Sequence, residues 1–193
     1  EMSTSDWSSD VCSSDLSYAP VDGEMHRIGR VELDVEGART EVVDLVGTRR
    51  ADVIVLNDDD LTYAKVRLDE ASLAAGLEGI AMFTESLPRS VVLASAWDMV
   101  RDGELDASRY LDAALAALAV ETHSSVVQGL LARIATCLGS YLPPAVRADR
   151  AVRAAQELLD LARAAEPGGD KQLQLVRAVA AHAVTEEIGR AHV

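Results

Sequence analysis

The chain has 193 residues and carries 18 Lys and Arg against 32 Asp and Glu, which gives a formal net charge of −14. This acidity excludes nucleic acid and anionic membrane surfaces as expected partners. No apolar run is long enough to span a bilayer.

The two ends of the chain resemble the translation of a single DNA oligonucleotide. If residues 10–16 are written as GAC GTG TGC TCT TCC GAT CT, the reverse complement encodes Glu-Ile-Gly-Arg-Ala-His-Val, the sequence of residues 187–193. Such ends are expected when a sequencing adapter flanks a DNA fragment on both sides. We therefore interpret residues 1–16 and 187–193 as non-native tails and expect them to be unpacked or incidentally helical.

Excluding these tails changes the candidate chemistry. Cys12 and His192 are no longer candidate ligands, and Cys137 is then the single cysteine, so an internal disulfide is excluded and a reducing, cytoplasmic compartment is expected. Four carboxylates are lost with the tails while Glu187 and Arg190 cancel, so the net charge changes from −14 to −10. We expect residues 17–186 to be an internal piece of a longer protein, whose native ends and any signal peptide lie elsewhere.

Residues 17–68 are predicted to form a partial β-sandwich domain. Strands are expected over residues 30–35, 39–46, 52–57 and 63–68. The first alternates apolar and charged residues, and the turn at 36–38 makes a hairpin with the second the simplest interpretation. The third is a short apolar run suited to a buried strand, and the fourth alternates again. Short turns between four strands favour an antiparallel sheet or half of a sandwich.

Residues 69–186 have a helical period and are predicted to form a truncated helical domain. Helices are expected to begin at Asp69, Ser86, Asp106, Ser124, Pro143 and Asp170. The N-cap candidates are Ser86, Asp106, Ser124 and Asp170, and the candidate stops are Gly103, Gly139 and Gly168. Short links imply antiparallel helix pairs, as in an α-solenoid of the HEAT or armadillo kind. The fold class is therefore α+β, mostly α.

A calcium loop is weighed and rejected in the link before the first helix. Asp58, Asp60, Thr62 and Asp69 occupy positions 1, 3, 5 and 12 of such a loop, where oxygen ligands are required. Position 6 is Tyr63, although a glycine is needed there for the turn. A polar turn, in which Asp and Asn side chains bond their own backbone, is the favoured interpretation.

The other candidate ligands are also interpreted as structural. His182 and Glu186 are four residues apart on a helix, but no third zinc ligand is near in sequence. His26 and His123 are expected at the surface or in satisfied structural positions, and Cys137 is expected to be a small buried hydrophobe. No catalytic, cofactor-binding or metal-binding residue is predicted.

Two further features come from the stretch at 90–105. Trp97 and Met99 are expected in the core and not at a ligand site. Asp98 and Arg101 are three residues apart on a helix, which predicts an ion pair.

Two stretches together carry a resemblance to a known family. "VIVLNDDDLTYAKVRLDE" at 53–70 and "SVVLASAWDMVRDGELDASRYL" at 90–111 resemble the C-terminal half of zinc-dependent gluzincin aminopeptidases of the actinobacterial aminopeptidase N type. In that family a catalytic domain with Gly-x-Met-Glu-Asn and His-Glu-x-x-His motifs precedes a β-sandwich and a helical C-terminal domain. None of those motif residues has a counterpart in this chain.

The resemblance implies an accessory region of a zinc aminopeptidase that removes N-terminal residues from peptides. Its helical domain would cap the catalytic cleft and control peptide access, and its acidity would favour cationic peptides. The zinc would lie in the missing N-terminal catalytic domain, the expected partner in cis, so the piece alone is expected to be inactive. The alternative is an independent helical-repeat scaffold that binds other proteins without enzymatic activity.

Overall fold

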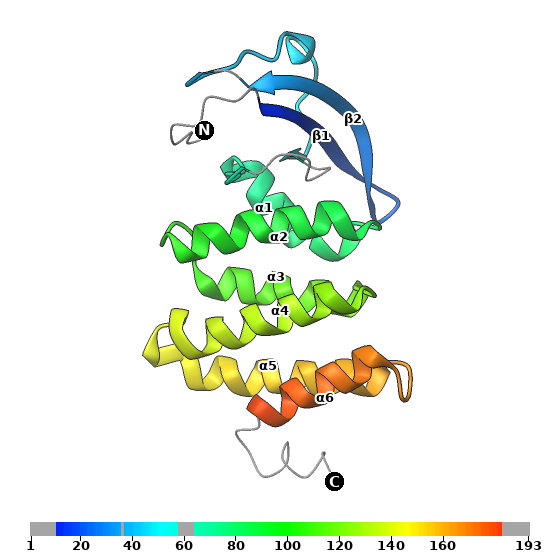
Figure 1. Ribbon diagram of the computed structural model, residues 1–193, viewed down its shortest axis with the longest axis vertical. Helices are drawn as coiled ribbons and strands as arrows, with labels where there is room; N and C mark the ends of the chain where they lie inside the picture. The colour runs from blue at the N-terminus through cyan, green and yellow to red at the C-terminus, as the bar shows by residue number, and fades with distance from the viewer. Residues whose placement is uncertain (1–10, 36, 58–63, 183–193) are drawn as a thin grey trace. The chain divides into compact units, whose positions relative to one another are not determined.

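The computed structural model describes residues 11–35, 37–57 and 64–182 (Figure 1). Its contacts divide the chain into two compact units, Glu1–Leu105 and Asp106–Val193. The first unit holds the strands and two helices, and the second holds four helices. Residue 68, the expected end of the β domain, instead marks the change from extended to helical backbone within the first unit.

The first unit contains a three-stranded antiparallel sheet. Its strands are β1 (Val11–Val21), β2 (Glu24–Val35) and β3 (Val53–Leu56), in the order β2-β1-β3. β1 and β2 form a hairpin (Figure 1). Its turn residues Asp22 and Gly23 both have positive φ, 52° and 87°, as a two-residue turn that matches the twist of the strands requires.

Two strand predictions are wrong. β2 pairs with the strand before it, and the segment at 39–46 contains a short 3₁₀ helix, η1 (Val43–Leu45), in place of a strand. Val43 and Val46 are 72% and 80% exposed, so this segment buries no alternate face. Residues 64–68 form no ladder either, although Val66 and Leu68 are buried as an alternating strand would bury them. The strand at 52–57 is confirmed as β3.

The prediction that residues up to 16 are unpacked is wrong for residues 11–16. These residues form the first half of β1, where Asp15 pairs with Leu56 and Leu16 pairs with Val55. Sheet ladders use backbone N–H and C=O groups, so a segment can join a sheet whatever its origin.

Two helices complete the first unit, α1 (Glu70–Glu78) and α2 (Ser86–Arg101), with a 3₁₀ turn, η2 (Ile80–Met82), between them. Val53 and Val55 of β3 are fully buried, and so is Val92 of α2. A Cβ on Gly76 of α1 would lie 3.2 Å from Val92 Cγ1, which shows how closely the two helices approach. The core therefore lies between the sheet and these helices.

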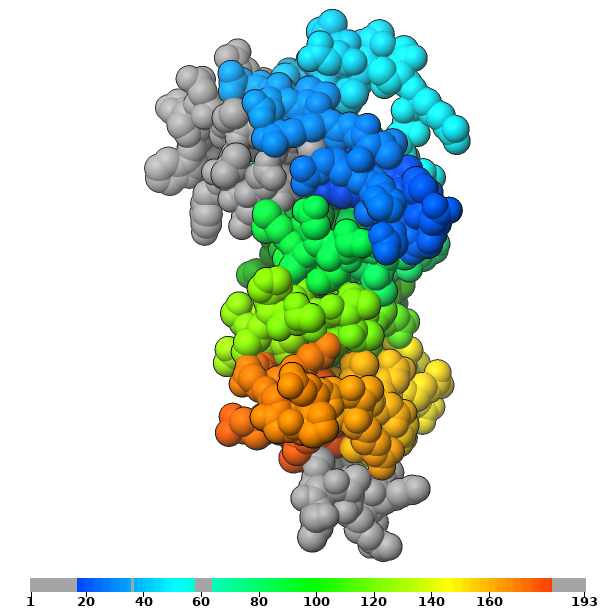
Figure 2. All heavy atoms as spheres, turned by 90° about the vertical axis from the view of Figure 1, so that its right-hand side faces the viewer, coloured from blue at the N-terminus to red at the C-terminus, as the bar shows by residue number. Residues whose placement is uncertain are grey.

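The second unit is an array of four helices. They are α3 (Ala107–Val120), α4 (Ser124–Thr136), α5 (Pro144–Ala164) and α6 (Asp170–His182), and the π-helical segment η3 (Cys137–Tyr141) follows α4. α4 packs on both α3 and α6, and α5 packs on both α3 and α6. This alternate stacking is typical of an α-solenoid. In Figure 2 the atoms of these helices, coloured green to orange, adjoin one another on the face in view.

The helix predictions are confirmed, since every predicted start lies within one residue of the observed one. Asp106 caps α3 as expected, whereas Ser86, Ser124 and Asp170 are the first residues of their helices. Gly103 and Gly168 follow helices with φ of 76°, but Gly139 lies inside η3. The fold class, α+β and mostly α, is confirmed. Within the described ranges, no helix has the length and apolarity needed to cross a bilayer.

Candidate functional site

The residues of the rejected calcium loop do not form a described site. Asp58, Asp60 and Thr62 lie outside the described residues. Asp69 is the N-cap of α1, and its Oδ1 accepts hydrogen bonds from the backbone N–H groups of Ala71 and Ser72 at 3.1 Å each. Burial raises the pKa of Asp69, but hydrogen bonds from Ser72 and the charge of Arg50 outweigh it, so the net pKa lies below 3.8. This carboxylate therefore serves the helix start.

His26 and His123, the two predicted histidines whose side chains are described, each lie beside a neighbouring glutamate. His26 Nε2 lies 3.5 Å from a Glu24 oxygen, and both side chains are about half exposed. His123 Nδ1 lies 3.0 Å from Glu121 Oε1 in the other unit. The side chains of His182 and Glu186 lie outside the described part of the chain.

Zinc, which the family resemblance implies, does not fit the described residues. In the described ranges no group of three or more His, Cys, Asp or Glu side chains is placed to hold a metal ion. A protein zinc site requires at least three such ligands. No catalytic step through zinc can be assigned to these residues.

The remaining sequence-predicted residues are structural. Cys137 is fully buried, as predicted, and burial raises the pKa of its thiol to about 12, which favours the protonated thiol. Arg101 Nη1 and Asp98 Oδ1 are 3.3 Å apart, which confirms the predicted ion pair. Trp97 and Met99 are half-buried on α2, so the prediction of core positions is only partly met.

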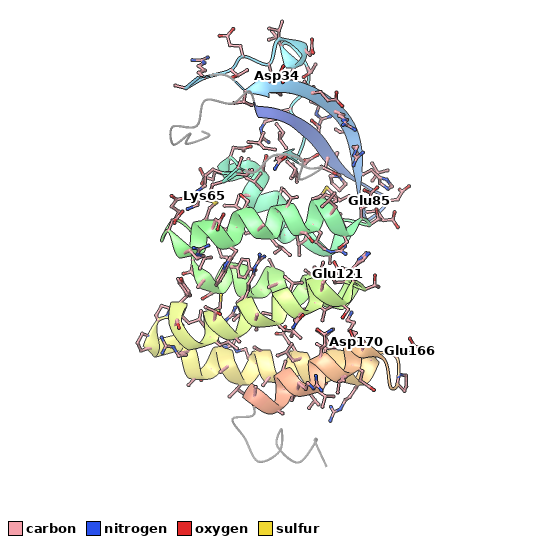
Figure 3. All side chains as sticks on the ribbon, viewed as in Figure 1. Asp34, Lys65, Glu85, Glu121, Glu166 and Asp170 are labelled. Atoms are coloured by element: carbon pink, nitrogen blue, oxygen red, sulfur yellow. The ribbon has the colours of Figure 1, made fainter. Side chains whose placement is uncertain are left out.

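An ion-pair cluster that the sequence did not reveal lies at the end of α2. Asp102 accepts hydrogen bonds from Lys65 and Arg67, and Arg67 Nε donates to Glu104 Oε2 at 2.6 Å (Lys65 is labelled in Figure 3). The hydrogen bond from Lys65 holds the pKa of Asp102 below 3.8. The cluster ties the extended segment before α1 to the residues after α2.

A second polar cluster joins the α3–α4 turn to α6. The side chain of Glu121 is fully buried, and its Oε1 accepts from the backbone N–H groups of Thr122 and His123 at 2.9 and 2.8 Å. Lys171 Nζ donates to the Glu121 carbonyl at 2.8 Å. Ser124 Oγ donates to Asp170 (Glu121 and Asp170 are both labelled in Figure 3). These bonds satisfy helix ends, which would otherwise leave orphan backbone groups.

The first unit also has an open pocket of ≈ 210 Å³ beside the hairpin. Its lining consists of Tyr18, Met25, His26, Arg27, Phe83, Thr84, Glu85 and Pro88. The Tyr18 and Phe83 rings meet edge to face with centroids 5.1 Å apart, and Arg27 lies 3.8 Å from Glu85 at the rim. An ion pair beside apolar side chains is typical of a shallow binding surface. The lining residues provide neither a metal centre nor a nucleophile with its base.

Comparisons with known proteins identify the family of this chain. A family model described as the ERAP1-like C-terminal domain matches residues 53–190. The chain is also 48% identical over 165 residues to a Streptomyces lividans protein named aminopeptidase N. This match covers 86% of the chain but 19% of the relative, so the chain spans about a fifth of the relative's length.

Proposed function

This chain belongs to the ERAP1-like C-terminal domain family and is a C-terminal region of an aminopeptidase N-like protein, and from that membership we propose its role. The parent protein is a zinc metalloaminopeptidase that removes N-terminal residues from peptides. The helical array caps its catalytic cleft and controls which peptides enter. The catalytic residues lie in a domain outside this chain. The parent enzyme works in the cytoplasm.

The observation that supports this role most directly is the extent of the match. The family model begins in β3 and continues through all six helices, so it includes the whole helical array and not a short motif. The described residues supply no metal-binding group of their own. A region that is similar to part of a peptidase, and whose described residues hold no metal-binding group, fits an accessory role in controlling peptide access.

The acidity of the chain supports a further part of this role. Without the tails the segment keeps a formal charge of −10, whose negative potential raises the local concentration of cationic peptides and is screened by salt. The parent enzyme should therefore prefer peptides rich in Lys and Arg at low ionic strength and lose that preference at high ionic strength.

A chimera tests the role in the context of an intact enzyme. The matching segment of the Streptomyces lividans relative is replaced by residues 53–182 of this chain, and the hydrolysis of aminoacyl anilides and of longer peptides is measured. We expect kcat/KM for the anilide within about tenfold of the unmodified relative, a change of ~1.4 kcal/mol or less. The ratio of peptide hydrolysis to hydrolysis of folded proteins should be the same for the chimera and the unmodified relative.

The purified chain alone is the control, and it should hydrolyse no anilide with or without added zinc. Zinc-dependent turnover by the chain alone would show that it holds its own active site. A chimera that is folded, binds zinc and is inactive would favour the alternative of an independent interaction scaffold.

A further inference from the structure

β2 is an edge strand along most of its length. The strand order places it beside β1 alone, and within the described ranges the bridge between Met25 and Phe83 is the one contact of the strand type on its outer side. Its register with β1 is regular from Gly29 to Val35, because the shift lies at Ser17/Tyr18, opposite Ile28. The outward backbone groups of residues 29–35 thus form a regular row that a further strand can pair with.

Charged residues normally protect such an edge, but on β2 one basic and two acidic side chains share a face. Arg30, Glu32 and Asp34 share one exposed face, on which Asp34 is labelled in Figure 3. Arg30 Nη2 already lies 2.6 Å from Glu32 Oε1 within the strand. Val31 and Leu33 are only half-buried on the opposite face. Charges of a single sign along the edge would repel a second copy of the strand. The mixed charges on β2 can instead pair with the opposite charges on β2 of a second copy.

The charge pattern selects one register for an antiparallel pair of β2 strands. With the two-fold axis at Val31, Arg30 of each copy lies opposite Glu32 of the other, and the two Val31 side chains meet. With the axis at Glu32, Arg30 of each copy would lie opposite Asp34 of the other, but the two Glu32 carboxylates would face each other at the centre. With the axis at Leu33, Glu32 would face Asp34. Opposite charges across a strand pair stabilise it and like charges destabilise it, so the Val31 register is favoured.

We propose that β2 is a self-association surface, which pairs antiparallel with β2 of a second copy of this chain about a two-fold axis at Val31. The pairing closes both β2 edges, so it produces a dimer and not a growing filament. The edge left at the other side of each sheet is β3, which has four residues. This inference is independent of the proposed peptidase role.

Charge reversal tests the surface and the register together. Sedimentation velocity on the full chain from about 1 to about 100 μM should show a concentration-dependent dimer, because a contact of this small size gives weak association. Arg30→Glu and Glu32→Arg should each weaken the dimer at least about tenfold, since each places like charges opposite one another twice. An equimolar mixture of the two variants should form a heterodimer, in which both acidic side chains of the Arg30→Glu chain face both basic side chains of the Glu32→Arg chain.

The matched controls reverse an exposed ion pair of the same kind on α5. Arg163 and Asp160 are 63% and 60% exposed, and Arg163→Glu or Asp160→Arg makes the same change in net charge without touching β2. These variants should dimerise as the parent chain does, and circular dichroism should show that all four variants are folded. A chain that stays monomeric over the whole range would overturn the proposal. So would a dimer that persists in both β2 variants, or a mixture of those variants that stays monomeric.

Discussion

The carboxylate of Asp106 lies at the start of α3, where it accepts a hydrogen bond from the Ser108 N–H at 2.6 Å. That backbone hydrogen bond, the Ser108 side chain and the charge of Arg150 hold the pKa of Asp106 below 3.8. Asp106→Ala should lower the free energy of unfolding at pH 7 by about 1 kcal/mol, the usual value of an N-cap. Urea denaturation monitored by circular dichroism measures this change.

The sign of the pH dependence follows from the lowered pKa of Asp106. The stabilisation is fully present above the unfolded value of 3.8, and it is lost as the pH falls through the lower folded value. The difference between the parent chain and Asp106→Ala should therefore shrink under acid conditions. Asp106→Asn is the control, because it keeps an N-cap acceptor without a titrating group. An Asn variant that is as unstable as the Ala variant would contradict the capping role.

Single residues differed in how far the sequence could predict them. Asp106 was predicted as a cap because capping depends on neighbours two and three residues away. Cys137 was predicted as buried because its apolar neighbours lie on the same helix face. Glu121 was missed, since its surroundings include residues distant in sequence, such as Lys171, which bonds its carbonyl from fifty residues further along the chain. No local pattern in "VETHSS" distinguishes a buried carboxylate from an exposed one.

At the scale of elements, α3 has the most completely buried apolar face of the second unit. Leu118 is fully buried in it, whereas Leu173 on α6 is 48% exposed. Leu118→Ala should lower the free energy of unfolding by about 2–5 kcal/mol, because it removes buried methyl groups and leaves a cavity. Leu173→Ala is the matched control and should change it by about 0.5 kcal/mol or less. Equal losses in urea denaturation would show that the assignment of inner and outer faces is wrong.

Helices were easier to predict than strands for a physical reason. Helix hydrogen bonds join residues four apart, so the spacing of apolar residues and the capping residues both depend on residues close together in the sequence. A strand needs a partner, and the alternation at 30–35 does not say whether that partner precedes or follows. The Asp22-Gly23 turn decided it, because both residues adopt positive φ and place β1 beside β2. Within the described residues, the 39–46 segment forms no strand ladder.

At the scale of the whole molecule, the order of strands before helices was predicted correctly, but the division into compact units was not predicted. The sequence shows a change of period at 69, whereas the compact units divide between Leu105 and Asp106. α1 and α2 bury the face of the sheet, so they belong with it despite their helical pattern. Periodicity reports local conformation and does not report which elements share a core.

The lack of a metal-binding group among the described residues gives a prediction at the same scale. Stoichiometric zinc should leave the Tm of the chain unchanged within about 1 °C, because a ligand stabilises a fold only where the fold provides a site for it. Differential scanning calorimetry with zinc and with a chelator measures this. A zinc-dependent rise in Tm that the chelator reverses would contradict the assignment of the described residues as non-ligands.

The two lysines of the sequence, Lys65 and Lys171, both hold parts of the fold together. Lys65 bonds Asp102 after α2, and Lys171 donates to the carbonyl groups of Ala119 and Glu121 at the end of α3. Apart from the α-amino group, amine-reactive dyes, biotin esters and bifunctional cross-linkers would therefore attach at these structural contacts. Bioconjugation of this chain should use an introduced cysteine on an exposed helix position, and its association should be measured on unlabelled protein.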